Sequence, residues 1–147
     1  MITLYTIGFT KKCAEDFFNL LRNNQVKSLV DVRINNSSQL AGFAKGKDME
    51  FFLKEICNIP YKHIIDFAPT KDLLDKWHKN EVSWSDYTKI YISMLKERNI
   101  LSKYGIDQFD KSCFLCSEET PENCHRRLLV EYLQEHSTKK AKIVHLL

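Results

Sequence analysis

The chain has 147 residues, with 22 lysines and arginines against 19 aspartates and glutamates, and therefore a formal net charge of +3. Hydrophobic residues make up 44% of the sequence and charged residues 28%, which excludes a disordered or membrane-spanning chain and is typical of one globular domain. The net charge is too small to indicate nucleic-acid binding by itself. Three of the five cysteines lie between Cys113 and Cys124, and this enrichment is the one unusual feature of the composition.

The N-terminal residues 1–8 carry no basic segment and no apolar stretch of the length found in signal peptides. No part of the chain approaches the roughly 18 consecutive apolar residues of a membrane-spanning helix. An odd number of cysteines in such a chain favours reduced thiols over a framework of disulfides. We therefore expect a cytoplasmic protein that has no membrane partner.

Short apolar and β-branched runs alternate along the chain with segments of helical periodicity. We predict strands over residues 2–6, 27–33, 61–65, 112–116 and 142–147. We predict helices after a cap at Thr10 and over residues 48–57, 69–79, 84–101 and 121–134. This alternation predicts one α/β domain over residues 1–147, a Rossmann-like three-layer fold with a mostly parallel sheet and helices on both faces.

Two of the predicted strands end in residues that suit ligand binding, which in open α/β sheets occurs beyond the carboxyl ends of the strands. Gly8 follows the first strand and permits either a sharp turn or a close approach of the backbone to a ligand. Asp31 and Arg33 lie two residues apart on the second strand and therefore on one face. Because burial of opposite charges is costly unless they are well paired, this pair is either a structural ion pair or part of a ligand site.

The end of the strand at residues 112–116 carries most of the candidate chemistry. Cys116 and Glu118 share a face if the extended conformation continues. Thr120 and Pro121 are typical of a helix start, with threonine as the cap and proline in the first helical position. Cys124 would then lie in the first turn of the helix, where the helix dipole favours a thiolate.

The residue types around these cysteines indicate nucleophilic chemistry on a small anionic or nucleotide-like molecule. Cys124 or Cys116 would act as the nucleophile, and Glu118, Asp31 or His125 would carry the proton. Arg126 would hold the anion together with the arginine of the second strand. The structural alternative is a cysteine packed as a small hydrophobe, with Arg126 paired with Glu118 or Asp31.

A zinc site built from Cys113, Cys116, Cys124 and His125 is a further alternative. Residues three apart on a strand point to opposite faces, which separates Cys113 from Cys116. Adjacent residues on a helix diverge by about 100°, which separates Cys124 from His125. We therefore expect neither a metal nor another cofactor at these residues.

The main alternative from another functional class is a nucleic-acid-associated module. Its basic face would contain Arg33, Lys45, Lys47, Arg126, Arg127 and the lysines of residues 139–142. Such a face would bind nucleic acid with an affinity that falls steeply with salt. The mild net charge makes this function less favoured than a small-molecule site.

Several segments of the chain resemble the family called domain of unknown function 488. They are Thr6-Ile7-Gly8, Leu29-Val30-Asp31-Val32-Arg33, Gly42-Phe43, Tyr61-x-His63 and the late motif Cys116-x-Glu118-x-x-Pro121-x-x-Cys124-His125-Arg126. The resemblance extends over nearly the whole chain, to residues 143–146. It implies a small α/β protein in which the polar residues of these motifs converge, and it supplies no substrate.

The chain departs from the family pattern at two places. The family glycine is commonly followed by His-Ser, whereas this chain has Phe9-Thr10. A proline often follows the Asp-x-Arg segment, whereas this chain has Asn35-Asn36. Chemistry in this protein therefore cannot depend on a histidine directly after Gly8.

The second strand and the late cysteine also resemble rhodanese loosely, which would imply sulfur transfer. The active cysteine of that family is surrounded by backbone amides and positive charge. In this chain Cys116 is followed by Glu118 and Glu119, which would repel an anionic persulfide. Sulfur transfer is therefore a lower alternative.

Overall fold

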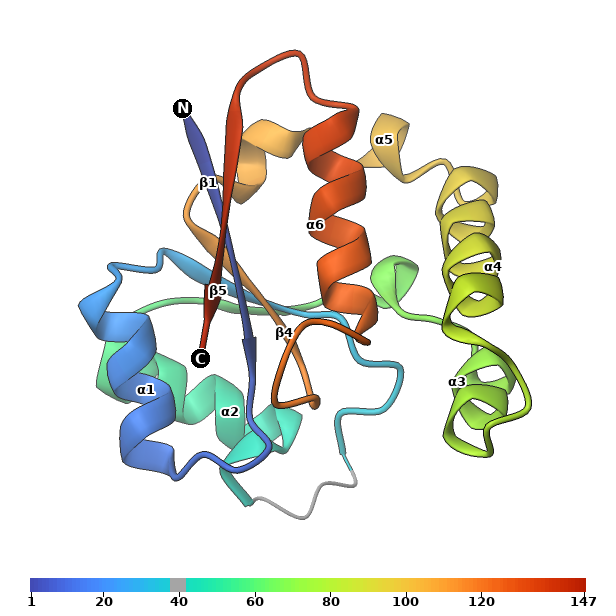
Figure 1. Ribbon diagram of the computed structural model, residues 1–147. Coiled ribbons are helices and arrows are strands. Elements are labelled where there is room, and N and C mark those ends of the chain that lie inside the picture. Colours follow the sequence, from blue (N-terminus) through green and yellow to red (C-terminus); the bar gives the residue numbers. More distant parts are fainter. Residues whose placement is uncertain (38–41) are drawn as a thin grey trace.

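The computed structural model describes residues 1–37 and 42–147, and its centre is a five-stranded parallel sheet (Figure 1). The strand order is β3-β2-β4-β1-β5. The strands are β1 (Ile2–Gly8), β2 (Ser28–Asp31), β3 (Tyr61–His63), β4 (Ser112–Cys116) and β5 (Ala141–Leu146). All four neighbouring pairs run parallel, which confirms the predicted α/β domain with a parallel sheet.

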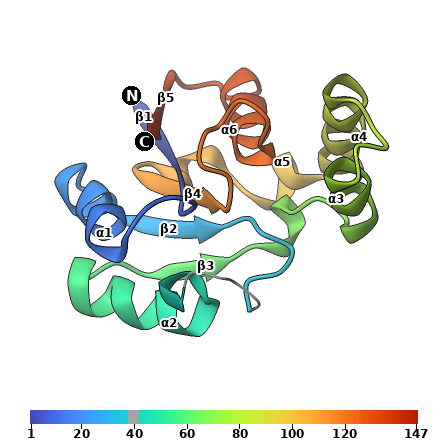
Figure 2. The same cartoon turned by 60° about the horizontal axis from the view of Figure 1, so that its bottom comes forward.

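Helices cover both faces of the sheet, as predicted (Figures 1 and 2). One face carries α1 (Ala14–Asn23), α2 (Gly46–Phe52) and its π-helical continuation η2 (Leu53–Cys57). The other carries α3 (Lys71–His78), α4 (Trp84–Glu97), α5 (Ile100–Lys103) and α6 (His125–Glu135). Three short 3-10 turns, η1 (Gly42–Ala44), η3 (Ile65–Phe67) and η4 (Ile106–Phe109), connect these elements. Within the described ranges, none of the helices is long and apolar enough to cross a membrane.

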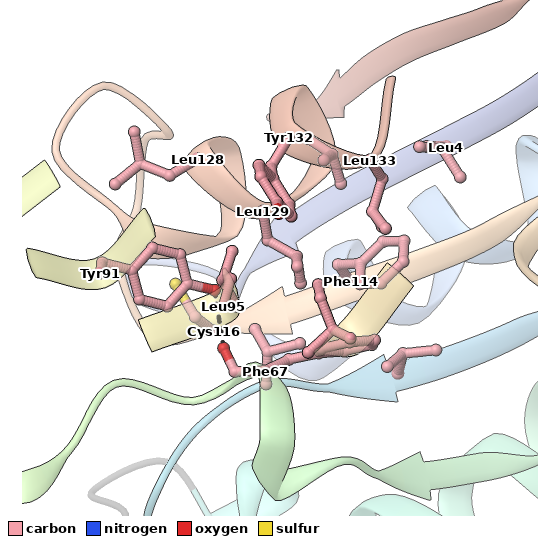
Figure 3. Close-up of a cluster of buried hydrophobic side chains, with 14 of the residues drawn as sticks. Leu4, Phe67, Tyr91, Leu95, Phe114, Cys116, Leu128, Leu129, Tyr132 and Leu133 are labelled. Atoms are coloured by element: carbon pink, nitrogen blue, oxygen red, sulfur yellow. Dashed lines mark hydrogen bonds between the residues drawn. The ribbon is translucent and has the colours of Figure 1, made fainter. Parts of the chain in front are cut away.

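The central strand β4 is buried along its whole length, because both of its faces are covered. Successive side chains point to opposite faces of a strand. Phe114 and Cys116 therefore pack against α4 and α6, in the cluster shown in Figure 3. Cys113 and Leu115 pack in the opposite cluster, against α1 and α2. The predicted separation of Cys113 from Cys116 is thus confirmed.

The helix predicted over residues 121–134 begins later, at His125. Thr120 and Pro121 do not start it, because the whole of residues 117–124 forms an irregular connection from β4. Cys124 occupies the N-cap position with an extended backbone, at φ −133° and ψ 138°. The prediction that Cys124 lies in the first helical turn is therefore wrong, and this changes where its sulfur points.

Two other predicted boundaries also differ. Cys13, not Thr10, occupies the N-cap position of α1. The hydroxyl of Thr10 instead donates a 2.6 Å hydrogen bond to the carbonyl of Ser117, tying the loop after β1 to the loop after β4. The helix predicted over 84–101 ends at Glu97, because Asn99 adopts a left-handed backbone conformation with φ 56°.

We expect Thr70→Ala to lower the free energy of unfolding by about 1 kcal/mol. The hydroxyl of Thr70 caps α3 by accepting a hydrogen bond from the amide of Leu73 at 3.1 Å. Thr88→Ala is the matched control, because the Thr88 hydroxyl donates to the Trp84 carbonyl inside α4, a bond that does not favour the helix. Urea unfolding measures both variants. Equal losses would contradict a specific capping contribution.

Candidate functional site

A pocket of about 230 Å³ lies where β2 and β4 end, which is the position at which open parallel sheets bind ligands. Its polar lining comes from Arg33, Asn35, His78, Cys116, Ser117, Glu118, Asn123, Cys124 and His125. Its apolar lining comes from Ile34, Leu74, Trp77 and Tyr87. Of the predicted site residues, Gly8, Asp31 and Arg126 do not line the pocket but lie behind those that do.

Gly8 allows the connection after β4 to close over the end of β1. It pairs in register with Cys116 across the two strands. A Cβ atom on Gly8 would collide with the carbonyl group of Glu118 and would lie 2.9 Å from Nη1 of Arg126. The absence of a side chain therefore serves backbone packing, and Gly8 contributes no surface to the pocket.

Asp31 and Arg33 form a buried, bidentate ion pair. Nε of Arg33 donates to Oδ1 at 2.9 Å, and Nη2 donates to Oδ2 at 2.7 Å. The backbone amide of Arg33 and the hydroxyl of Tyr61 donate to the same carboxylate, at 3.1 and 2.6 Å. Because four donors occupy its oxygens, Asp31 positions Arg33 and is not available as a proton carrier.

One nitrogen of this arginine remains without a hydrogen-bond partner. Nη1 of Arg33 is buried and unpaired, although the other guanidinium nitrogens are bonded to Asp31. The guanidinium carbon lies 5.3 Å from the centre of the Phe9 ring, so Phe9 supports Arg33. Buried polar groups normally have partners, and Arg33 lines the pocket, so its unpaired nitrogen is a candidate contact for a ligand.

Sequence reasoning did not assign roles to Asn36, Tyr61 and His63, which hold the Asp31–Arg33 pair. His63 Nε2 bonds to the carbonyl of Arg33 at 2.6 Å. The amide of Asn36 donates to the Tyr61 hydroxyl at 2.9 Å and lies 3.2 Å from Nδ1 of His63. The sequence pattern that could have indicated their role is the spacing of Tyr61 and His63, two residues apart on one strand. That strand, β3, pairs with β2 and places His63 beside Asp31.

The structure joins the sulfur atoms of Cys116 and Cys124 as a disulfide, across a Cα separation of 7.7 Å. The expectation of reduced thiols therefore does not hold for this pair. Cys13, Cys57 and Cys113 are free, and Cys113 is buried in the opposite core, where loss of solvent raises the pKa of its thiol. Only Cys116 and Cys124 line the pocket among these five.

Arg126 is fully buried behind the two sulfur atoms. Its Nη1 donates to the Glu118 carbonyl at 2.6 Å and lies 3.2 Å from Sγ of Cys116 and 3.7 Å from Sγ of Cys124. Its Nε and Nη2 have no hydrogen-bond partner. Among the described residues no carboxylate forms an ion pair with Arg126, so the expected alternative of pairing with Glu118 or Asp31 is wrong.

This cation favours negative charge on its neighbours. Loss of solvent lowers the pKa of Arg126 to about 10, so the guanidinium is still charged near neutral pH. A buried charge is costly unless an opposite charge compensates it. Once the Cys116–Cys124 disulfide is reduced, the two sulfur atoms that face Nη1 of Arg126 become ionisable, and the positive charge favours their thiolate forms.

His125 is buried and held in one orientation. Its Nε2 bonds to the carbonyl of Val32 at 2.7 Å, which places the proton on Nε2 and leaves a lone pair on Nδ1. The ring also packs edge-on against Tyr91, with centroids 5.6 Å apart. Burial, and then the charge of Arg126, lowers the pKa of His125 to about 4, so its imidazole is neutral near pH 7.

Cys116, Cys124 and His125 converge. The ligand-capable atoms of the three side chains all lie within 4.8 Å of one another. The predicted divergence of Cys124 from His125 is wrong, because it assumed that both residues are helical, whereas Cys124 has an extended backbone. Glu118 differs from this group, because its side chain is exposed at the rim of the pocket.

A protein-family model described as Domain of unknown function DUF488 matches residues 13–133. The chain belongs to the DUF488 family. The match includes the Asp31–Arg33 segment and the late motif from Cys116 to Arg126, which confirms the resemblance noted in the sequence. No curated protein and no solved structure matches the chain.

We expect Gly8→Ala to lower the free energy of unfolding by at least about 2 kcal/mol, because the added methyl group collides with backbone rather than with a flexible side chain. Gly105→Ala is the matched control, since a Cβ there meets nothing within 4 Å and its φ is not positive. That control should change stability by less than about 1 kcal/mol. Urea unfolding compares them. Equal effects would contradict close packing at Gly8.

Proposed function

We propose that this DUF488 protein is a small-molecule enzyme or ligand-binding domain, with a cysteine-dependent centre beside a pocket for an anionic or nucleotide-like ligand. The observation that carries this proposal is the unpaired, buried Nη1 of Arg33, a residue that lines the pocket. Asp31 fixes the guanidinium through its other two nitrogens and leaves this one for a ligand oxygen. Arginine is well suited to binding carboxylates and phosphates.

The apolar wall of the pocket supports a ligand that also has a planar part. Trp77 and Tyr87 line it, with ring centroids 5.7 Å apart. Tyr87 is only 1% exposed, and Trp84 stacks on it at 4.9 Å with an interplanar angle of 15°, so the half-buried Trp77 is the ring that a ligand can contact. Aromatic faces bind planar groups by stacking. A planar group next to an anion describes a nucleotide-like molecule.

The cysteines and His125 supply the chemistry in this proposal. In the reduced chain, Arg126 favours ionised sulfur at Cys116 and Cys124, and the Nδ1 lone pair of His125 can accept a proton. Glu118 lies at the rim, where it can exchange protons with solvent. Thiolates in such a place have two possible roles, as nucleophiles or as metal ligands.

The alternative is a nucleic-acid-associated module. Burial removes Arg33 and Arg126 from the basic face that this function requires. Of the exposed cations in that face, Lys139 is already paired with Asp107 at 2.9 Å. These observations favour the small molecule. Nucleic-acid affinity that falls steeply between low and moderate salt would support the alternative.

Sulfur transfer is the second alternative. Glu118 and Glu119 have exposed side chains, and Glu119 pairs with Lys11 at 3.3 Å, which reduces their repulsion of an anionic sulfur at Cys116. Arg126 also donates to the Cys116 sulfur. A thiosulfate:cyanide assay tests this function, and the absence of thiocyanate formation would exclude it.

We expect the double variant Asp31→Asn/Arg33→Gln to bind anionic ligands about 10-fold or more weakly than the wild type, since a hydrogen bond to a charged group contributes roughly 1.5–3 kcal/mol. The double variant removes both charges, so it leaves no unpaired buried ion that would unfold the protein. Isothermal titration calorimetry with inorganic phosphate and with nucleoside mono- and diphosphates measures the affinities.

Arg22→Gln controls for a general loss of positive charge, because Arg22 is exposed on α1 and outside the pocket. It should bind these ligands as the wild type does. Binding by the Asp31→Asn/Arg33→Gln variant at wild-type affinity would contradict the proposed ligand site. So would the absence of binding by the wild type to every member of the panel.

A further inference from the structure

We propose that, once a thiol reductant has supplied the two electrons that break the Cys116–Cys124 disulfide, the two thiolates and His125 bind one soft divalent metal ion of the zinc class, with a fourth coordination position that opens into the ligand pocket. The inference deepens the proposed function and rests on it for the ligand that would occupy that position. It replaces the expectation from the sequence that these residues hold no metal. It also assigns the thiolates the role of metal ligands rather than nucleophiles.

The three donor atoms already lie close enough together for one ion. All three lie within 4.8 Å of one another, on side chains that are 2%, 2% and 7% exposed for Cys116, Cys124 and His125. Zinc binds sulfur at about 2.3 Å and nitrogen at about 2.0–2.1 Å, so tetrahedral ligand atoms lie roughly 3.3–3.8 Å apart. Small rearrangements of the two sulfur atoms therefore complete the site.

The backbone separation of the two cysteines also suits an ion between their sulfur atoms. Their Cα atoms are 7.7 Å apart, whereas disulfides usually span about 4.4–6.8 Å. An ion between the sulfur atoms makes the link longer than a direct bond does. The distance between the end of β4 and the start of α6 thus suits two thiolates that share a metal better than two cysteines that form a disulfide.

Neighbouring groups hold the donor side chains in place. Metal-binding histidines usually donate their other ring N–H to a carbonyl or carboxylate, and Nε2 of His125 bonds to the Val32 carbonyl in this way. Arg126 donates toward both sulfur atoms from behind. The contact of His125 uses Nε2 and leaves the lone pair of Nδ1 for a metal.

The net charge of the reduced site favours a divalent cation. Two thiolates beside Arg126 leave one net negative charge in a buried place, which a divalent cation converts into one net positive charge. A monoanionic ligand in the fourth position then neutralises the centre. The metal thus agrees with the anionic ligand inferred independently from Arg33.

The number of ligands indicates the type of site. Structural zinc sites use four protein ligands, whereas catalytic sites use three and leave one position for water or substrate. Within the part of the chain that the structure describes, the cluster has three members. Cys113 is excluded because it packs on the other face of β4. Since all three members line the pocket, the remaining position faces the ligand.

The test is the metal content of the full chain, purified under reducing conditions without chelator and measured by inductively coupled plasma mass spectrometry. We expect roughly one zinc per chain, because a buried Cys/Cys/His set binds this ion tightly. Cys116→Ser, Cys124→Ser and His125→Gln should each lose most of it. Glutamine retains an N–H for the Val32 carbonyl but removes the imidazole lone pair.

Cys113→Ala is the matched control, because it removes a buried cysteine from the same strand on the opposite face. It should retain the metal. If the site variants fail to fold, cobalt titration of metal-free wild-type protein provides the second readout. Thiolate coordination then produces a sulfur-to-cobalt charge-transfer band in the near ultraviolet, and the Cys113→Ala protein should produce the same band.

Three results would overturn the inference. They are reduced, folded protein with neither zinc nor a cobalt band, metal retained in all of the site variants, or a Cys116–Cys124 disulfide that persists under reductant in metal-free protein. Calorimetry of the metal-free protein separates the two proposals. Anion binding by a protein that binds no metal would support the proposed function and contradict the metal site. Metal binding by a protein that binds no anion would support the metal site and contradict the proposed function.

Discussion

The Arg126 guanidinium is fully buried between the end of β4 and the start of α6, and its hydrogen-bond partners are two sulfur atoms and a backbone carbonyl. A cation in that position needs negative charge close by, because water cannot reach it. The Glu118 carbonyl that accepts from Arg126 belongs to the connection after β4. This connection lies tightly over the end of β1, which requires Gly8. Thr10 ties the same two loops together from outside. The positions of the cysteines follow from this packing.

The charge of a second buried arginine, Arg33, is compensated by a carboxylate, unlike that of Arg126. Asp31 neutralises it with two hydrogen bonds, so Arg33 carries an unpaired NH2 group beside the pocket rather than an uncompensated charge. Arg126 instead acts on the sulfur atoms and does not line the pocket. Arg33 is thus placed to contact a ligand, and Arg126 is placed to stabilise negative charge on the two sulfur atoms. The sheet brings them together because β2 and β4 are neighbours whose carboxyl ends coincide.

The sequence was sufficient to predict the alternation of strands and helices, the buried central strand β4 and the placement of Cys113 away from Cys116, because these depend on local periodicity. It was not sufficient for the convergence of Cys124 with His125. Thr120 and Pro121 have the residue types of a helix start, but tertiary packing of residues 117–124 on Gly8 and Arg126 overrides that local preference. The support of Arg33 by Tyr61 and His63 depends on strand order, which no single segment encodes.

The central claim is that Cys116 and Cys124 are thiolates that share a metal with His125 beside the buried charge of Arg126. The most direct measurement is a crystal structure of the reduced protein, with anomalous diffraction recorded on both sides of the zinc absorption edge. We predict one anomalous peak at bonding distance from both Sγ atoms and from the His125 ring. Continuous electron density between the two sulfur atoms, with no anomalous peak beside them, would contradict the claim.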